Sequence, residues 1–146
     1  MLYHRAPLVR GTRWRAGMTD DELITAVESL SLPLQAFTHS EHVHLAWACL
    51  RRWPLLDALR EFRRLLVAFA THHGKPGLYH ETVTFAYLLL VFERMARTPA
   101  LTDWNTFSRE HADLLSWRDG PFFSYYDAGI LGDPRARAAF ILPEPR

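Results

Sequence analysis

Three histidines have the residue type and the spacing of metal ligands. His39 and His42 lie three positions apart, so both rings can face one ion from the same side of a helix. His80 begins a later, strongly apolar segment and can supply a third nitrogen from a neighbouring helix. Buried imidazoles in so small a domain need a partner, and a metal ion is the usual one. The sequence therefore predicts a metal site formed by His39, His42 and His80.

The expected metal is a transition ion, because ligation by imidazole alone suits copper or iron, and also zinc, better than magnesium or calcium. Three protein ligands would leave positions for water, dioxygen or a substrate. Glu81 follows His80 directly, and adjacent residues of a helix diverge by about 100°. We therefore expect Glu81 to act as a catalytic base, or to orient a ligand, instead of binding the ion itself.

The same polar side chains also fit a structural interpretation. His72 and His73 precede Gly74, where histidine can bind the last carbonyl groups of a helix. His111 falls on an apolar stripe and is expected to pack with one hydrogen bond. Glu41 has the spacing of a capping-box acid. In this alternative the histidines only cap and support helix ends.

Helical periodicity and capping signals divide the chain into about five helices. The first begins after Thr19, whose hydroxyl is placed to cap it, and the second begins after Thr38 in a second capping-box pattern. Pro54 and Gly74 bound the third, and Asp103 is the expected cap of the fifth. The predicted ranges are 20–30, 39–53, 55–73, 78–97 and 104–114, with a further short helix near 133–140.

The fold class predicted from this pattern is all-α, a single antiparallel bundle with an irregular aromatic C-terminal tail. Short connections make successive helices antiparallel neighbours. The starts of the second and fourth helices and the ends of the third and fifth then share one end of the bundle, which brings the histidines together. The 78–97 segment is apolar almost all round, so we expect it to be the central helix.

Composition indicates one folded domain, residues 18–146, preceded by a flexible basic arm, residues 1–17. The arm contains four arginines and no acid, which leaves the rest of the chain near −3 within a formal net charge of +1. An acidic body argues against a nucleic-acid partner. The single cysteine, Cys49, excludes an internal disulfide, and no apolar run reaches the length of a membrane span. We therefore expect a cytoplasmic protein.

Two motifs resemble a known family. Phe37-x-His39-x-x-His42, followed by Tyr79-His80-Glu81-Thr82 and a later Tyr125-Tyr126, is similar to a pattern in small uncharacterised bacterial proteins that are all-helical. The resemblance covers roughly residues 35–143. It supports the pairing of the two histidine motifs and implies no particular reaction.

The leading functional hypothesis is a small metal-dependent enzyme with redox chemistry, of the oxygenase or oxidase type, on a small organic substrate. A zinc-dependent hydrolase with Glu81 as base is the enzymatic alternative. The third possibility is a helical binding module without catalysis, in which the histidines only hold helix ends. The sequence leaves the oligomeric state open.

Overall fold

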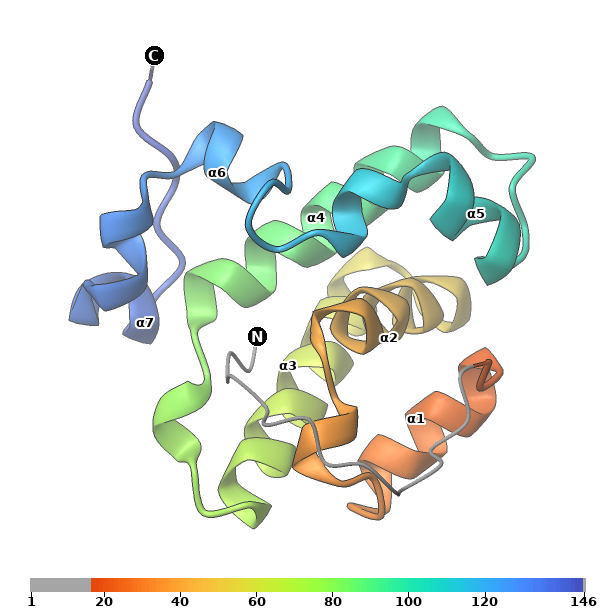
Figure 1. Ribbon diagram of the computed structural model, residues 1–146, viewed down its shortest axis with the longest axis horizontal. Coiled ribbons are helices and arrows are strands. Elements are labelled where there is room, and N and C mark those ends of the chain that lie inside the picture. The colour runs from red at the N-terminus through yellow and green to blue at the C-terminus, as the bar shows by residue number, and fades with distance from the viewer. Residues whose placement is uncertain (1–16, 146) are drawn as a thin grey trace.

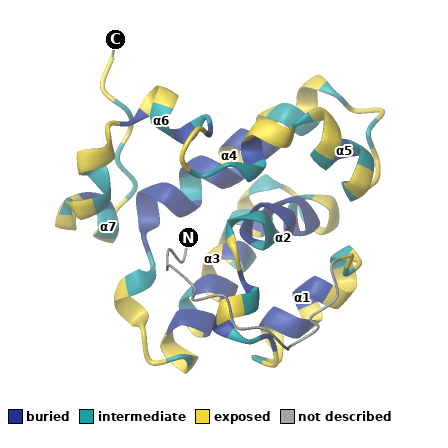
Figure 2. Cartoon of the chain, viewed as in Figure 1, coloured by how far each residue is buried: buried dark blue, intermediate teal, exposed yellow. Residues whose placement is uncertain are grey.

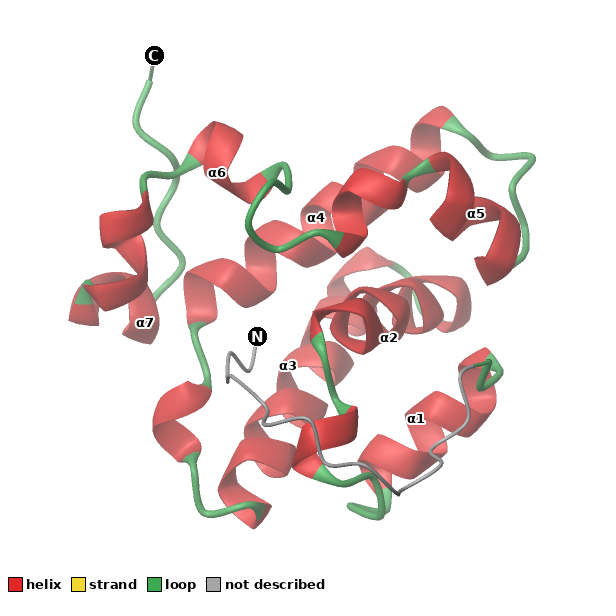
Figure 3. Cartoon of the chain, in the orientation of Figure 1, coloured by secondary structure: helices red, strands yellow, loops and turns green. Residues whose placement is uncertain are grey.

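The structure is a computed structural model that describes residues 17–145. Its helices are joined by loops, and no strand occurs among these residues (Figure 3). The predicted all-α class is thus confirmed. The predicted basic arm lies almost entirely in residues 1–16, outside the described residues, and stays a prediction.

Seven α-helices and four short 3₁₀ turns follow one another in the described part of the chain (Figure 1). The α-helices are α1 (Asp20–Glu28), α2 (His39–Arg52), α3 (Leu55–His72), α4 (Glu81–Arg97), α5 (Trp104–Glu110), α6 (Phe122–Tyr125) and α7 (Pro134–Ala138). The 3₁₀ turns are η1 (Leu34–Ala36), η2 (Pro76–Leu78), η3 (Ala112–Leu115) and η4 (Ala128–Gly132).

The helix starts lie where the capping signals predict them. The Thr19 hydroxyl accepts a hydrogen bond from the Glu22 amide at 3.2 Å. The Thr38 amide donates to the Glu41 carboxylate at 3.1 Å, as a capping box requires. Asp103 caps α5 by accepting from the Thr106 amide at 2.8 Å. Local sequence therefore determined these three boundaries.

The central helix is α2, and the expectation that the 78–97 segment occupies this place is wrong. Every residue from His42 to Cys49 is buried, and α2 packs against α1, α3 and α4 (Figure 2). In α4, by contrast, Leu89 and Phe92 are 38% and 41% exposed. The apolar surface of α4 exceeds what its neighbours cover, so hydropathy alone overestimated its burial.

The C-terminal region is more ordered than the predicted irregular tail. It forms α6, η4 and α7, and both α6 and α7 pack against α4. The predicted short helix near 133–140 corresponds to α7, which begins after its cap Asp133. Within residues 17–145 no helix is long and apolar enough to span a membrane.

Candidate functional site

His39 is the first residue of α2 and is held against η3 and α4. Its Nε2–H donates to the carbonyl oxygen of Leu114 at 2.9 Å. The ring meets the edges of two aromatic rings, Tyr87 at 4.7 Å and Trp117 at 5.5 Å between centroids. Burial, partly opposed by the Leu114 hydrogen bond, lowers the pKa of His39 from 6.5 to about 4. The imidazole is therefore neutral at physiological pH.

His42 lies one turn later and is fully buried, but its ring packs in a different environment. Its Nδ1–H donates to the Thr38 carbonyl at 2.7 Å, and the ring stacks on Phe37 at 3.9 Å. Phe37 in turn contacts Phe69 of α3. His39 thus faces the side of α4 and η3, whereas His42 faces the side of η1 and α3.

His80 is the N-cap of α4 and uses both ring nitrogens within the protein. Nδ1 accepts from the Val83 amide at 3.3 Å, and Nε2–H donates to the Ile130 carbonyl at 3.2 Å. Capping by a histidine ring satisfies one of the amides that a helix start leaves without a partner. For His80 to bind a metal, one of these two hydrogen bonds would have to break.

Glu81, the predicted catalytic base, forms an ion pair with Arg63 of α3. The Arg63 Nε–H donates to both carboxylate oxygens, at 2.9 and 3.2 Å. The carboxylate is largely buried, while the guanidinium is half exposed. In this position Glu81 ties the start of α4 to the middle of α3.

The structure gives no support to one metal site at the three predicted ligands. Within residues 17–145, no three His, Cys, Asp or Glu side chains come together in a group that could hold a metal ion. The site of His39, His42 and His80 therefore stays a prediction.

His111 lies away from His80, contrary to the expected meeting of helix ends. It contacts Arg94 and Thr98 at the far end of α4, with Thr98 Oγ1 3.0 Å from Nε2. Arg94 is fourteen residues from His80, or roughly 21 Å along a helix. The reason is the length of α5. With only seven residues it cannot run back along α4.

The Tyr79-His80-Glu81-Thr82 motif has a structural role that sequence analysis missed. The buried Thr82 hydroxyl lies 2.8 and 2.9 Å from the carbonyl oxygens of Ala136 and Ala139, and it accepts from the Ile141 amide at 3.1 Å. His80 holds Ile130 in the same way. The motif thus fixes the C-terminal segment, residues 130–143, on the start of α4. No signal in local periodicity predicts such a contact.

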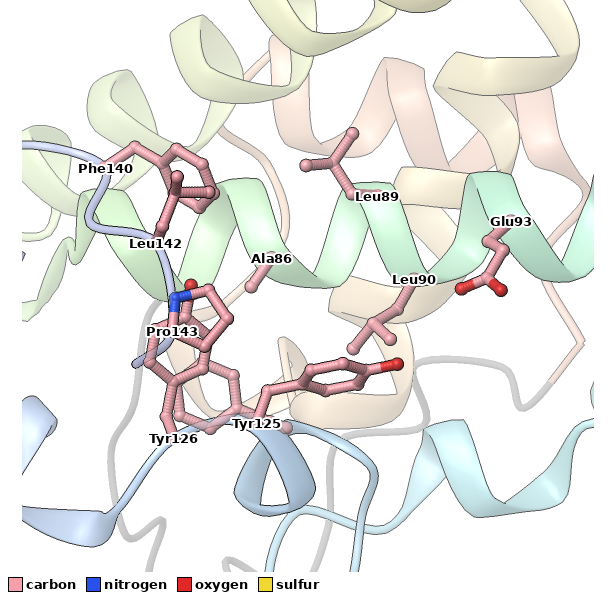
Figure 4. A pocket seen from close by; sticks show the side chains of 10 residues that line it. Ala86, Leu89, Leu90, Glu93, Tyr125, Tyr126, Phe140, Leu142 and Pro143 are labelled. Atoms are coloured by element: carbon pink, nitrogen blue, oxygen red, sulfur yellow. The ribbon is translucent and has the colours of Figure 1, made fainter. Parts of the chain in front are cut away.

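A pocket of about 230 Å³ lies where this segment passes α4 and α6 (Figure 4). The sequence does not predict it, because the apolar residues of α4 and the apolar run 140–143 indicate a buried core, and only the structure shows that part of α4 stays uncovered. Three structural elements line it, with one acid at the margin: Ala86, Leu89, Leu90 and Glu93 from α4, Phe122, Tyr125 and Tyr126 at α6, and Phe140, Leu142 and Pro143 from the C-terminal segment.

Two contacts fix the C-terminal wall of this pocket. The Tyr126 hydroxyl donates to the Ile141 carbonyl at 2.7 Å, and the Phe140 ring stacks on Phe85 of α4 at 5.4 Å. The segment is thereby held at residues 140 and 141, while the short α6 ends at Tyr125. The space between them stays open and apolar.

Acidification is expected to weaken the fold through His39. The unfolded chain takes up this proton near pH 6.5 but the folded protein only near pH 4, so stability that is complete above pH 6.5 is lost as the pH falls towards 4. Between pH 7 and pH 4 the wild type should lose about 3 kcal/mol more unfolding free energy than a His39→Gln variant. Urea denaturation at a series of pH values measures the difference, and parallel curves would contradict it.

Comparison with family models, with curated proteins and with solved structures finds no match to this chain. The family suggested by the two histidine motifs therefore stays a prediction, and function is inferred from the chain's own geometry.

Proposed function

We propose that this protein binds a small, largely apolar molecule in the pocket between α4, α6 and the C-terminal segment. The observation that carries the proposal is the pocket itself, whose lining is apolar or aromatic except for Glu93 and the tyrosine hydroxyls. Concave apolar pockets with a few polar groups are the usual form of small-molecule sites. This proposal develops the binding-module alternative and assigns its ligand to this pocket.

The pocket volume suits a molecule built on one aromatic ring. An apolar cavity of about 150 Å³ holds benzene, and this pocket is somewhat larger, at about 230 Å³. Leu89, Tyr125 and Leu142 are exposed at its margin. A ligand that covers them would remove their apolar surface from water, which stabilises the complex by about 25 cal/mol per Å² of buried apolar surface.

Filling the pocket should abolish binding while leaving the fold intact. Ala86 lies on the wall formed by α4 (Figure 4), so Ala86→Leu places a larger side chain in the space the ligand needs. We expect phenethyl alcohol to bind the wild type and to lose at least about tenfold in affinity in the variant, since the ligand's apolar contacts are excluded. Titration followed by protein NMR gives the dissociation constants.

Ala96→Leu is the matched control, because Ala96 is an exposed residue of the same helix outside the pocket lining. Its affinity should equal that of the wild type. Absence of binding to the wild type, or equal affinity in Ala86→Leu, would refute the proposal.

Metal binding at the start of α2 is a second candidate, supported by the anchoring of two imidazoles, and it requires the His39 and His42 rings, which face different sides of α2, to turn towards one ion. His39 and His42 each donate one ring N–H to a backbone carbonyl. Metal-binding histidines usually have this arrangement, which orients the ring and leaves the opposite nitrogen unprotonated. A catalytic role of Glu81, and copper, iron or zinc as the ion, belong to this candidate.

The test is the metal content of protein purified without a histidine tag and then exposed to Cu²⁺, Fe²⁺ or Zn²⁺. We expect about one ion per chain in the wild type, loss of the ion in His42→Ala, and retention in His72→Gln, which changes an exposed histidine. Glu81→Gln should retain the ion if Glu81 is no ligand. A wild type that takes up no metal would end this candidate.

A further inference from the structure

We infer that the ligand of the apolar pocket is an aromatic amine, whose ammonium group lies beside Glu93 and whose ring lies against α6 and the C-terminal segment. This inference rests on the proposed function and goes beyond it by assigning charge and orientation to the ligand. Two features of the pocket carry it: the distribution of charge around the lining and the placement of one tyrosine hydroxyl.

Among the described residues that line the pocket, Glu93 alone has a formal charge. Its carboxylate is at one end of the pocket, next to Leu90, while Phe140, Leu142 and Pro143 form the other end (Figure 4). A molecule with an apolar body and one cationic group matches this separation. An anionic ligand would meet repulsion from Glu93, and the described lining residues include no cation, while the nearby Arg97 and Arg94 are paired with Glu93 and Asp113.

Tyr125 adds a polar group on the same side. Its ring extends from α6 along the pocket, and its hydroxyl points towards the Leu90 and Glu93 end (Figure 4). A hydroxyl oxygen accepts a hydrogen bond from an ammonium group, and the face of the Tyr125 ring attracts a cation at close range. Glu93 and Tyr125 therefore favour a primary amine over a neutral or acidic ligand.

Arg97 competes for the same carboxylate. It forms an ion pair with Glu93 one turn away on α4, and both side chains are about half exposed or more. Such exposed pairs contribute little to stability, so an ammonium group can replace the guanidinium at small cost. The competition has a measurable consequence, because removal of Arg97 should strengthen amine binding.

A second, more polar hollow borders the pocket and offers the ammonium group another place. It shares Tyr125, Tyr126 and Leu142 with the pocket, and Glu144 is among its acids. Asp133 in this hollow already binds Arg135 at 3.0 Å. The ammonium position beside Glu93 and a position beside Glu144 predict different variants to be sensitive, so Glu144→Gln serves as the comparison.

The experiment compares three probes of nearly equal shape: phenethylamine, phenethyl alcohol and 3-phenylpropionate. Affinities are measured by NMR titration at neutral pH and low salt on the full chain. We expect phenethylamine to bind about two- to fivefold more tightly than the alcohol, the size of an exposed ion pair, and the acid to bind most weakly. Glu93→Gln should remove the preference for the amine, so that amine and alcohol bind this variant with equal affinity, and Arg97→Gln should increase the preference for the amine.

Each remaining outcome has one meaning. Equal affinity of amine and alcohol in the wild type overturns the inference and leaves the proposed function standing. A preference that survives Glu93→Gln and disappears in Glu144→Gln also overturns it, because the ammonium group then lies in the neighbouring hollow. If none of the three probes binds, the proposed function and the inference fail together. Thermal unfolding of each variant verifies that the fold is intact.

Discussion

Replacing Gly120 by alanine is expected to lower the free energy of unfolding by about 3 kcal/mol, the upper end of the usual range for overpacking a buried site. A β-carbon at this position would lie 2.0 Å from the carbonyl oxygen of Ser116 and 3.1 Å from the Tyr87 hydroxyl. The first contact is with backbone, which cannot rotate away, so the chain between η3 and α6 must shift.

The shift would reach the pocket. Phe122 follows two residues later, is fully buried and stacks on Tyr126 at 4.8 Å. Gly129→Ala is the control, because a β-carbon there meets no atom within 4 Å. Urea denaturation compares both variants with the wild type. An unfolding free energy of Gly120→Ala within about 0.5 kcal/mol of the wild type, the usual range for surface changes, would contradict the expectation.

Thr82→Val is expected to lower the free energy of unfolding by about 2–3 kcal/mol, because a buried carbonyl and an amide lose their common partner. Valine keeps the shape of threonine, so the loss reports the hydroxyl and not a cavity. The groups affected belong to the C-terminal segment, from Ala136 to Ile141. We therefore also expect this segment to open more often, with faster hydrogen exchange at the Ile141 amide.

The control is Thr71→Val. The Thr71 hydroxyl donates to the Val67 carbonyl on the exposed side of α3. It should change stability by less than about 0.5 kcal/mol. Because residues 140–143 form one wall of the pocket, Thr82→Val should also weaken ligand binding. Unchanged exchange at Ile141 would show that other contacts, such as the Tyr126 hydrogen bond, suffice to hold the segment.

Arg137 also attaches the C-terminal segment, in addition to the Tyr79-His80-Glu81-Thr82 motif. Its guanidinium donates to the carbonyl oxygens of Gly77, Tyr79 and Leu131, at 2.6, 3.1 and 3.0 Å. These bonds join α7 to the connection before α4 and to η4. The C-terminal segment is thus bound from both sides, which gives the pocket a defined wall.

The sequence by itself determined the helical class and the starts of α1, α2 and α5. Thr19, Thr38 with Glu41, and Asp103 cap helices through bonds to residues three positions away. These features depend on neighbours in the chain, so local patterns contain all the information that they require.

Only the tertiary structure decided what the histidines and the apolar surfaces do. The partners of His39, His80 and Thr82 are 75, 50 and at least 54 residues away, so no spacing in the sequence reports them. The lengths of the connections and of the seven-residue α5 also determined which helix ends meet. A histidine that binds a backbone carbonyl and a histidine that binds a metal ion are the same residue type, so the sequence alone does not distinguish them. The choice depends on which distant group the fold brings within hydrogen-bonding distance.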